Sequence, residues 1–373
     1  MAGLDALPLR DDLRGSQPYG APQLDVSVRL NVNENPFPPD PAVVADVSRA
    51  VADATTTLNR YPDRDARELR AALATYLGHG LDASRVWAAN GSNEVMLQLL
   101  QAFGGPGRRA LGFTPTYSMY PDYCTDTFTT YATAARAADF TLDADAAVAA
   151  VRDHTPTVVL LASPNNPTGT ALPLDVVAAV CEATRDAGGA SRAVVVVDEA
   201  YAEFRRPGTP TALTLLDTYP NLVVTRTMSK AFALAGARVG YLASSPEVVQ
   251  AVQLVRLPYH LSAVTQAVAR VALRHADSLL ERVAQLRDER DALVRWLREQ
   301  GWSAADSDAN FVLFGCFGDR HKVWQALLDQ GVLVRETGPA GWLRVSVGTP
   351  SENEAFRNAL RAAVVAAGEE DRT

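Results

Sequence analysis

The sequence has 373 residues, of which 47% are hydrophobic and 21% charged, and its formal net charge is −8. The length predicts a large buried core and more than one domain, and the negative charge argues against nucleic acid or an anionic membrane as the main partner. Three widely spaced cysteines without a CxxC pair give no disulfide or metal-binding framework, and the lack of a long apolar run excludes a membrane span or signal peptide, so we expect a cytoplasmic protein.

The first 40 residues are rich in Pro, Asn and Asp, and the stretch NVNENPFPPD at 31–40 is too broken for regular structure. We therefore expect residues 1–40 to form an N-terminal arm that leads into a small domain. From Asp65 the apolar residues recur at helical spacing. Asp65 and Glu68 suit a capping box at the start of this helix, and Gly78 suits its end.

Between residues 86 and 245, short apolar runs alternate with helical stretches, a pattern typical of a parallel sheet covered by helices. The predicted strands are Val86 to Ala89, Ala110 to Phe113, Val158 to Ala162, Val194 to Val197, Leu222 to Thr225 and Val239 to Ala243. The pattern predicts an α/β fold whose large domain covers residues 41–245. Residues 246–373 follow as a smaller α+β domain, with helices broken near Leu257 and Pro258, strands in NFVLFGCF and WLRVSVG, and a final helix from about 352.

Two of the predicted strands end in polar turns, and ligands of open α/β sheets bind at these carboxyl ends. The turn PNNPTG at 164–169 leaves the side chains of Asn165 and Asn166 projecting, although taken alone this motif slightly favours a simple turn. Asp198 follows the strand AVVVV, and Tyr201 lies three residues further on. A buried carboxylate needs a partner; a structural ion pair would explain Asp198 alone, but the nearby Tyr201 favours a functional site.

A third strand leads to Lys230, one of only two lysines among 35 basic residues. Unlike arginine, lysine can lose its proton, act as a base and condense with a carbonyl. Ser229 and Arg238 beside it form a possible anion cradle. A second anion site is possible at AANGSNE, where the amides of Ser92 and Asn93 open a helix, although both residues are also common helix caps.

Together these groups call for a ligand that has a phosphate, a carbonyl open to attack by lysine, a basic ring nitrogen and a ring oxygen. Pyridoxal 5′-phosphate has all four. A carboxylate at the ring nitrogen keeps that nitrogen protonated and so strengthens the ring as an electron sink.

The chain resembles the fold type I pyridoxal-phosphate enzymes and, among them, the histidinol-phosphate aminotransferase family. The resemblance covers nearly the whole chain. It is carried by LNVNENPFPP, LNRYPD, AANGSNE, FTPTYSMY, SPNNPTG, VDEAY, RTMSKAFALAGARVGY, VRLPYHLSAVTQA, SDANFVLF and LRVSVG, in this order. The NPTG element alone occurs in many aminotransferases, whereas the ordered set is specific.

The resemblance implies a role for each matching residue. Lys230 would condense with the cofactor aldehyde, and Asp198 would pair with the ring nitrogen. The remaining cofactor contacts would be Asn166 and Tyr201 at the ring hydroxyl, Tyr117 stacked on the ring, and Ser92, Asn93, Ser229 and Arg238 at the phosphate. Tyr61 would reach the same phosphate from the neighbouring subunit, which implies a homodimer with shared active sites.

At the substrate end, the resemblance implies Tyr19, Arg335 and Arg344, with Arg344 also serving the carboxylate of glutamate. The match at Arg335 rests on a shorter and more variable stretch than the match at Arg344. Asn93 stands where related enzymes often carry an acid, a departure that leaves the backbone contacts unaffected.

The implied reaction transfers an amino group between L-histidinol phosphate and 2-oxoglutarate, giving imidazole acetol phosphate and L-glutamate in L-histidine biosynthesis. The nearest alternative is an aromatic aminotransferase that uses phenylalanine. A lyase or decarboxylase acting on a phosphorylated amino acid is more distant. A ligand-sensing transcription regulator of the same fold would need a DNA-binding domain, which the first 40 residues are too short to supply.

Overall fold

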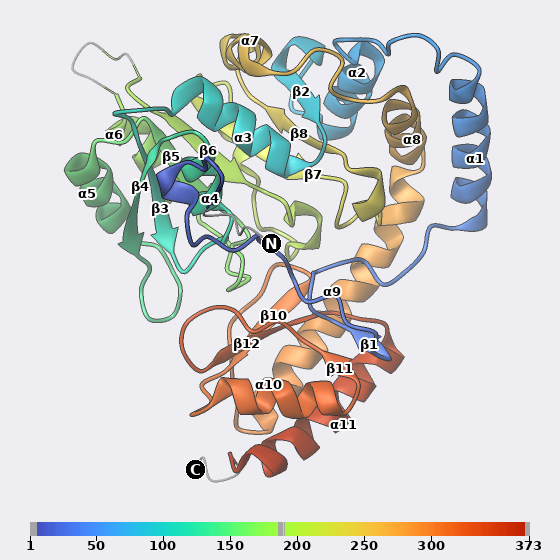
Figure 1. Ribbon diagram of the computed structural model, residues 1–373, viewed down its shortest axis with the longest axis vertical. Helices are drawn as coiled ribbons and strands as arrows, with labels where there is room; N and C mark the ends of the chain where they lie inside the picture. The colour runs from blue at the N-terminus through green and yellow to red at the C-terminus, as the bar shows by residue number, and fades with distance from the viewer. Residues whose placement is uncertain (1–5, 186–188, 190, 370–373) are drawn as a thin grey trace.

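A seven-stranded sheet forms the centre of the larger part of the molecule (Figure 1). The computed structural model describes residues 6–185, 189 and 191–369. Along the sheet the strand order is β2-β8-β7-β6-β5-β3-β4, and β8 runs antiparallel to both of its neighbours while the other pairs are parallel. The strands are β2 (Val86–Ala89), β3 (Arg109–Thr114), β4 (Thr130–Ala135), β5 (Val158–Ala162), β6 (Val194–Asp198), β7 (Leu222–Thr227) and β8 (Gly240–Ala243).

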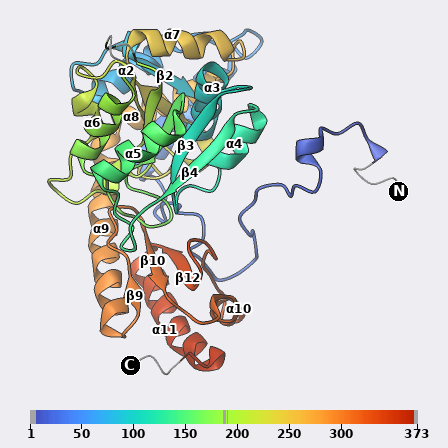
Figure 2. The same cartoon turned by 90° about the vertical axis from the view of Figure 1, so that its left-hand side faces the viewer.

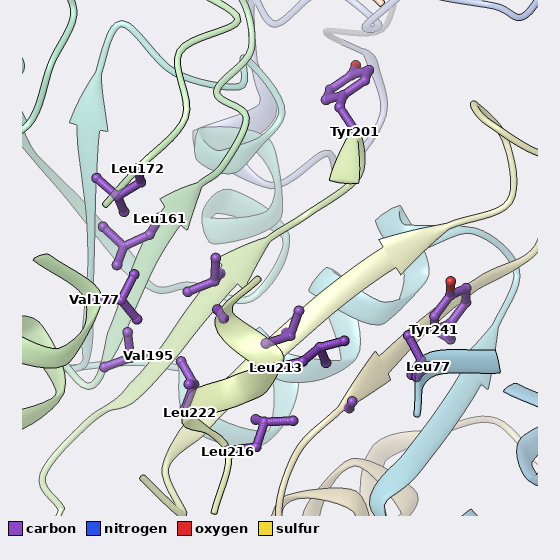
Figure 3. Close-up of a cluster of buried hydrophobic side chains, with 14 of the residues drawn as sticks. Leu77, Leu161, Leu172, Val177, Val195, Tyr201, Leu213, Leu216, Leu222 and Tyr241 are labelled. Atoms are coloured by element: carbon purple, nitrogen blue, oxygen red, sulfur yellow. The ribbon is translucent and has the colours of Figure 1, made fainter. Parts of the chain in front are cut away.

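Helices cover both faces of this sheet, so its central strands β5 and β6 are buried at every position. On one face, Val158 and Leu160 pack against α3 (Ser92–Phe103), α4 (Tyr120–Asp126) and α7 (Pro246–Val255). On the other face, Val159 and Leu161 belong to a larger core (Figure 3). Its helices are α2 (Arg67–Leu77), α5 (Ala144–His154), α6 (Leu174–Ala183), α8 (Ala263–Arg274) and the first half of α9 (Ala276–Glu299).

The smaller part of the molecule is built on the second half of α9, which runs from one core into the other (Figure 1). It contains the antiparallel sheet β12-β10-β9 and the helices α10 (Arg320–Asp329) and α11 (Pro350–Ala367). Its strands are β9 (Ser303–Ala304), β10 (Phe311–Gly315) and β12 (Trp342–Ser346). None of the helices in the described part of the chain combines the length and apolar character needed to cross a bilayer.

The N-terminal segment joins both parts. Residues 6–27, before β1 (Val28–Arg29), form an extended arm on one side of the molecule (Figure 2). Arg10 of this arm donates a hydrogen bond to the carbonyl of Thr125 at 2.9 Å. β1 then pairs in parallel with β11 (Val332–Leu333) of the smaller part. After β1 the chain crosses to α1 (Pro41–Thr55), which lies beside α8.

Several sequence expectations are confirmed in these elements, and two are corrected. All six predicted strands are present, but the edge strand β4 was not predicted. The helix after Asp65 ends at Gly78, as expected, whereas the predicted capping box is wrong. The residue before the helix is Ala66 in a left-handed conformation, and Asp63 accepts from the Arg67 amide at 2.8 Å. Asp65 instead forms ion pairs with arginines, among them Arg256.

Candidate active site

A cavity of about 440 Å³ opens at the carboxyl ends of the parallel strands. The register brings Ala162 of β5 and Thr225 of β7 to either side of Asp198, the last residue of β6. The cavity wall contains every predicted site residue except Tyr61: Tyr19, Ser92, Asn93, Tyr117, Asn166, Asp198, Tyr201, Ser229, Lys230, Arg238, Arg335 and Arg344. Residues from distant parts of the sequence thus share one site.

Asp198 is only 8% exposed and is surrounded by hydrogen-bond donors rather than cations. Its Oδ1 accepts from the Ala200 amide at 3.2 Å and from Thr225 Oγ1 at 3.3 Å, and its Oδ2 accepts from Tyr120 Oη at 3.1 Å. Burial raises the pKa of Asp198 to about 6, although these hydrogen bonds oppose the shift. The carboxylate therefore lacks a positive partner among the described residues, and a protonated ring nitrogen would supply one.

The next residue, Glu199, has the opposite environment. Burial would raise its pKa, but Arg226 and Arg205 outweigh that effect and lower it. Arg226 Nη2 donates to Glu199 Oε2 at 2.7 Å, and the Ala212 amide donates to Oε1 at 2.8 Å. Glu199 is thus satisfied inside the protein, so of these two neighbouring acids Asp198 is the one available to a ligand.

Lys230 lies just beyond β7, with its Nζ donating to the carbonyl of Val32 at 3.0 Å. Burial and the positive charge of Arg344 lower the pKa of Lys230 to about 8. A lysine with such a pKa has a substantial neutral fraction near physiological pH, the form that attacks carbonyls and accepts protons. The other lysine, Lys322, is exposed on α10 with 68% of its side chain accessible.

The predicted anion cradle forms where the first turn of α3 meets β8 and the loop before it. Arg238 Nη1 donates to Ser229 Oγ at 3.3 Å. A Cβ added to Gly91 would lie 2.5 Å from the Arg238 guanidinium, and one added to Gly240 would lie 2.1 Å from the Ser92 amide nitrogen. These glycines let the helix terminus, the hydroxyl and the guanidinium approach one another, an arrangement suited to phosphate.

Tyr117, Asn166 and Tyr201 surround the space between the cradle and Asp198. Tyr201 Oη accepts from Asn33 Nδ2 at 3.0 Å, and Tyr201 is 6% exposed. Asn166 differs from its neighbour Asn165, which was expected to project in the same way. Asn165 is fully buried and supports the turn, donating to the Pro115 carbonyl at 2.9 Å and to Thr168 Oγ1 at 2.8 Å.

Two arginines of the smaller domain complete the cavity. Arg344 donates to Asn166 Oδ1 at 2.6 Å and to the carbonyl of Asn31 at 2.8 Å, while its Nε is buried without a hydrogen-bond partner. Arg335 pairs with Arg344 through the backbone, and its guanidinium carbon lies 6.0 Å from the centre of the Tyr19 ring. Neither arginine has an acidic partner in the described part of the chain, so both are available to an anion.

Tyr61 lies apart from the cavity of its own chain. Its side chain is 79% exposed and stacks on Tyr259 with 4.4 Å between ring centres. A single chain therefore does not bring Tyr61 to the predicted phosphate site.

Sequence reasoning missed two groups that contact the predicted site residues. One is Tyr120, which lies three residues after Tyr117 in FTPTYSMY and donates to Asp198. The other is the segment containing Val32 and Asn33, whose contacts to Lys230 and Tyr201 join residues far apart in the chain. The signals available for the second group were the polar, broken composition of residues 31–40 and the motif LNVNENPFPP.

Comparison with known proteins agrees with this geometry. The family model for aminotransferase class I and II matches residues 26–360. The chain is 66% identical over 357 residues to the histidinol-phosphate aminotransferase of Thermobifida fusca, a match covering 96% of this chain and 95% of that protein. It is 59% identical over 361 residues to histidinol-phosphate aminotransferase 3 of Burkholderia lata, which covers 96% of each chain.

Among solved structures, the histidinol-phosphate aminotransferase of Sinorhizobium meliloti in complex with pyridoxal-5′-phosphate superposes with a TM-score of 0.80. The two sequences are 27% identical, and the superposition covers 91% of each chain. The fold and the cavity thus define a fold type I aminotransferase that depends on pyridoxal phosphate. Within that class, the chain belongs to the histidinol-phosphate aminotransferases of the class I and II family.

The chemistry of the cavity residues also fits this cofactor, independently of the comparisons. The close approach at Gly91 and Gly240 leaves a cradle that a side chain would fill, and Asp198 lacks a cationic partner where a ring nitrogen would need a carboxylate. Lys230 has a lowered pKa and lines the same cavity. The cradle thus suits the cofactor phosphate, Asp198 suits the ring nitrogen, and Lys230 suits the aldehyde.

Proposed function

We propose that this enzyme transfers the amino group of L-histidinol phosphate to 2-oxoglutarate, forming imidazole acetol phosphate and L-glutamate, in L-histidine biosynthesis. Full-length similarity to proteins named for histidinol phosphate supports the proposal. The structural observation that carries it is the pair Arg335 and Arg344, which line the cavity and have no acidic partner among the described residues. A phosphate ester needs such cationic donors, whereas the side chain of phenylalanine does not.

Pyridoxal phosphate, when bound, supplies an aldehyde for the substrate amine and a ring that withdraws electrons from the adjoining carbon. Asp198 holds a proton on the ring nitrogen, and its burial strengthens that ion pair. Asn166 and Tyr201 would bind the ring hydroxyl, and Tyr117 would hold the ring. These roles are supported by the positions of the four side chains in the cavity wall.

Lys230 is the group that moves protons. Its Nζ would hold the cofactor through the aldehyde, and the same amine would accept the proton that leaves the substrate carbon. The lowered pKa of Lys230 supports this role, because an amine with a pKa of about 8 is partly neutral at working pH. Ser92, Asn93, Ser229 and Arg238 would hold the cofactor phosphate.

Arg335, Arg344 and Tyr19 bind the far end of the substrate. In the half-reaction with glutamate, Arg344 binds a carboxylate in place of the phosphate. Each charged hydrogen bond contributes about 1.5 to 3 kcal/mol, so Arg335, which has no counterpart charge to bind in phenylalanine, favours the phosphate ester by roughly ten- to a hundredfold.

We further propose a homodimer in which Tyr61 of the partner subunit contacts the cofactor phosphate. The support is a hydrophobic surface patch, defined here as Leu58, Tyr61, Leu254, Leu257 and Tyr259. Exposure of these side chains ranges from 41% to 87%. The two segments of this patch, residues 58–61 and 254–259, meet through the stacked rings of Tyr61 and Tyr259. Exposed apolar patches of this kind mark protein interfaces.

We also propose the cytoplasmic location that the sequence predicts.

The experiment that tests the substrate assignment compares kcat/KM of the cofactor-loaded protein for three amino donors with 2-oxoglutarate: L-histidinol phosphate, L-histidinol and L-phenylalanine. We expect a large preference for the phosphate ester, lost when the phosphate is absent. Equal or better turnover of phenylalanine would contradict the assignment and identify an aromatic aminotransferase.

A further inference from the structure

Tyr120 is a fully buried side chain that contacts two of the proposed cofactor-binding residues. It is the first residue of α4. Its hydroxyl donates to Asp198 Oδ2 at 3.1 Å, and its ring meets the Tyr117 ring edge to face, with 5.6 Å between centres and an angle of 89°. One side chain thus joins the residue proposed for the ring nitrogen to the residue proposed for the ring face.

The hydrogen bonds at Asp198 are divided unequally between its two oxygens. Oδ1 accepts from Thr225 and Ala200, which fills both of its lone-pair positions. Oδ2 accepts from Tyr120 alone in the described structure and so retains one free position. This oxygen is the one able to accept from a ring N–H, and the Tyr120 hydroxyl fixes its orientation.

The direction of the hydrogen bond is also fixed. Burial and the nearby charge of Asp198 raise the pKa of Tyr120 well above its ordinary value, so the phenol keeps its proton and serves as a donor to the carboxylate. A donor to the ionised form favours ionisation, which opposes the effect of burial on Asp198.

We infer that Tyr120 is a positioning residue of this enzyme, one that orients the Asp198 carboxylate toward the cofactor ring nitrogen and keeps it ionised without touching the cofactor. The inference rests on the proposed role of Asp198. It assigns to Tyr120 a task that a buried aromatic side chain used only for packing would not have.

The test measures equilibrium dissociation constants of the cofactor-free protein for pyridoxal phosphate and for 1-deazapyridoxal phosphate, in which a C–H replaces the ring nitrogen. The variant is Tyr120→Phe, which removes one oxygen and keeps the ring against Tyr117. The matched control is Tyr131→Phe, because the Tyr131 hydroxyl is also buried but has no hydrogen-bond partner in the described structure.

We expect Tyr120→Phe to weaken binding of pyridoxal phosphate by about ten- to a hundredfold, the effect of one hydrogen bond to a charged group. Binding of the deaza analogue should change little, and Tyr131→Phe should leave both constants unchanged. An equal loss for the two ligands, or no loss beyond that of the control, would overturn the inference.

The wild-type protein separates this inference from the proposal on which it rests. If the wild type itself binds the two ligands equally, the role of Asp198 fails and the role of Tyr120 fails with it. If the wild type prefers pyridoxal phosphate and Tyr120→Phe retains that preference, only Tyr120 is excluded. Should Tyr120→Phe not fold, Tyr120→Met provides the second test, since it also removes the hydroxyl donor to Oδ2, and the same selective loss is expected.

Discussion

At the scale of single residues, the surroundings of a buried acid decide whether its carboxylate can bind a ligand. Asp198 and Glu199 are adjacent buried acids, but only Glu199 is paired with arginine, through Arg226 and Arg205. Their pKa values consequently move in opposite directions. The unpaired acid is the one in the cavity wall, where a cationic ligand can neutralise it.

Lys230 should make the cofactor-free protein less stable at neutral pH than Lys230→Met. Its pKa is about 8 in the folded protein and 10.5 ordinarily, so between these values the unfolded chain binds the extra proton. Stability of the wild type therefore rises with pH across this window, relative to the variant, and the deficit is constant below pH 8. Melting temperatures of both proteins from pH 6 to 10.5 measure the difference.

Parallel melting curves across that range would show that the Lys230 amine is not destabilised by burial. The same variant should have no measurable transamination, because methionine cannot condense with an aldehyde or carry a proton.

Arg335→Gln should lower kcat/KM for L-histidinol phosphate by about ten- to a hundredfold, the contribution of one charged hydrogen bond. The value for L-histidinol, which has no phosphate, should stay nearly constant, so the ratio of the two substrates is the informative measurement. Arg361→Gln is a suitable control, because Arg361 lies on α11 and its guanidinium packs over Trp296. A parallel loss for both substrates would place Arg335 outside the phosphate site.

At the scale of elements, the anion cradle is formed by the contact between β8 and the start of α3. Gly240→Ala should weaken pyridoxal phosphate binding by at least about tenfold, because the new methyl group must displace the Ser92 backbone. Titration of the cofactor-free protein, followed by absorbance, gives the dissociation constant. An unchanged constant would mean that the start of α3 does not contact the phosphate.

The sequence predicts elements well where burial is continuous along the chain. β5 has the predicted bounds, Val158–Ala162, because all five residues are buried. β4 was not predicted because this edge strand has no fully buried residue to mark it. The cap of α2 was wrong because Asp65 pairs with Arg256, almost two hundred residues away, and sequence spacing carries no information on such a contact.

Site residues that directly follow a buried strand could also be predicted from the sequence. Residues at strand ends, such as Asp198, were placed in the cavity because parallel strands end at one edge. Asn33 and Tyr120 were not identified, since each acts through a partner distant in sequence. The roles assigned to the predicted residues stay predictions until the experiments above are made.

The boundary between the domains, expected near residue 245, also stays a prediction. Val249 of α7 packs on the α3 and α4 face of the sheet, and Ala269 of α8 packs on the opposite face. The core of the smaller part contains Leu30 of the N-terminal segment and, after α8, starts again at Leu293 in the second half of α9. This packing favours a boundary within α9.

At the scale of the whole molecule, the proposed dimer can be tested at its hydrophobic patch. Leu257→Glu should produce monomers and weaken cofactor binding, because charge in a closed interface is costly and Tyr61 of the partner subunit would be lost from the site. Sedimentation measures the mass. Val365→Glu is the matched control, since Val365 is also exposed, at 60%, but lies on α11 of the smaller domain (Figure 1).

A dimeric mass for Leu257→Glu, or a monomeric mass for the wild type, would contradict this interface. A monomeric wild type that still binds pyridoxal phosphate would also exclude a role for Tyr61.

The scarcity of lysine has a practical consequence for chemical labelling. Apart from the α-amino group, the chain offers an amine-reactive dye only two side chains, Lys230 and Lys322. When Lys230 is engaged by the cofactor, Lys322 on α10 is the remaining side-chain amine, and the exposed thiol of Cys316 lies nearby in the sequence on the same domain. The two groups accept different reagents, so two different probes can be attached to the smaller domain of the natural protein without mutagenesis.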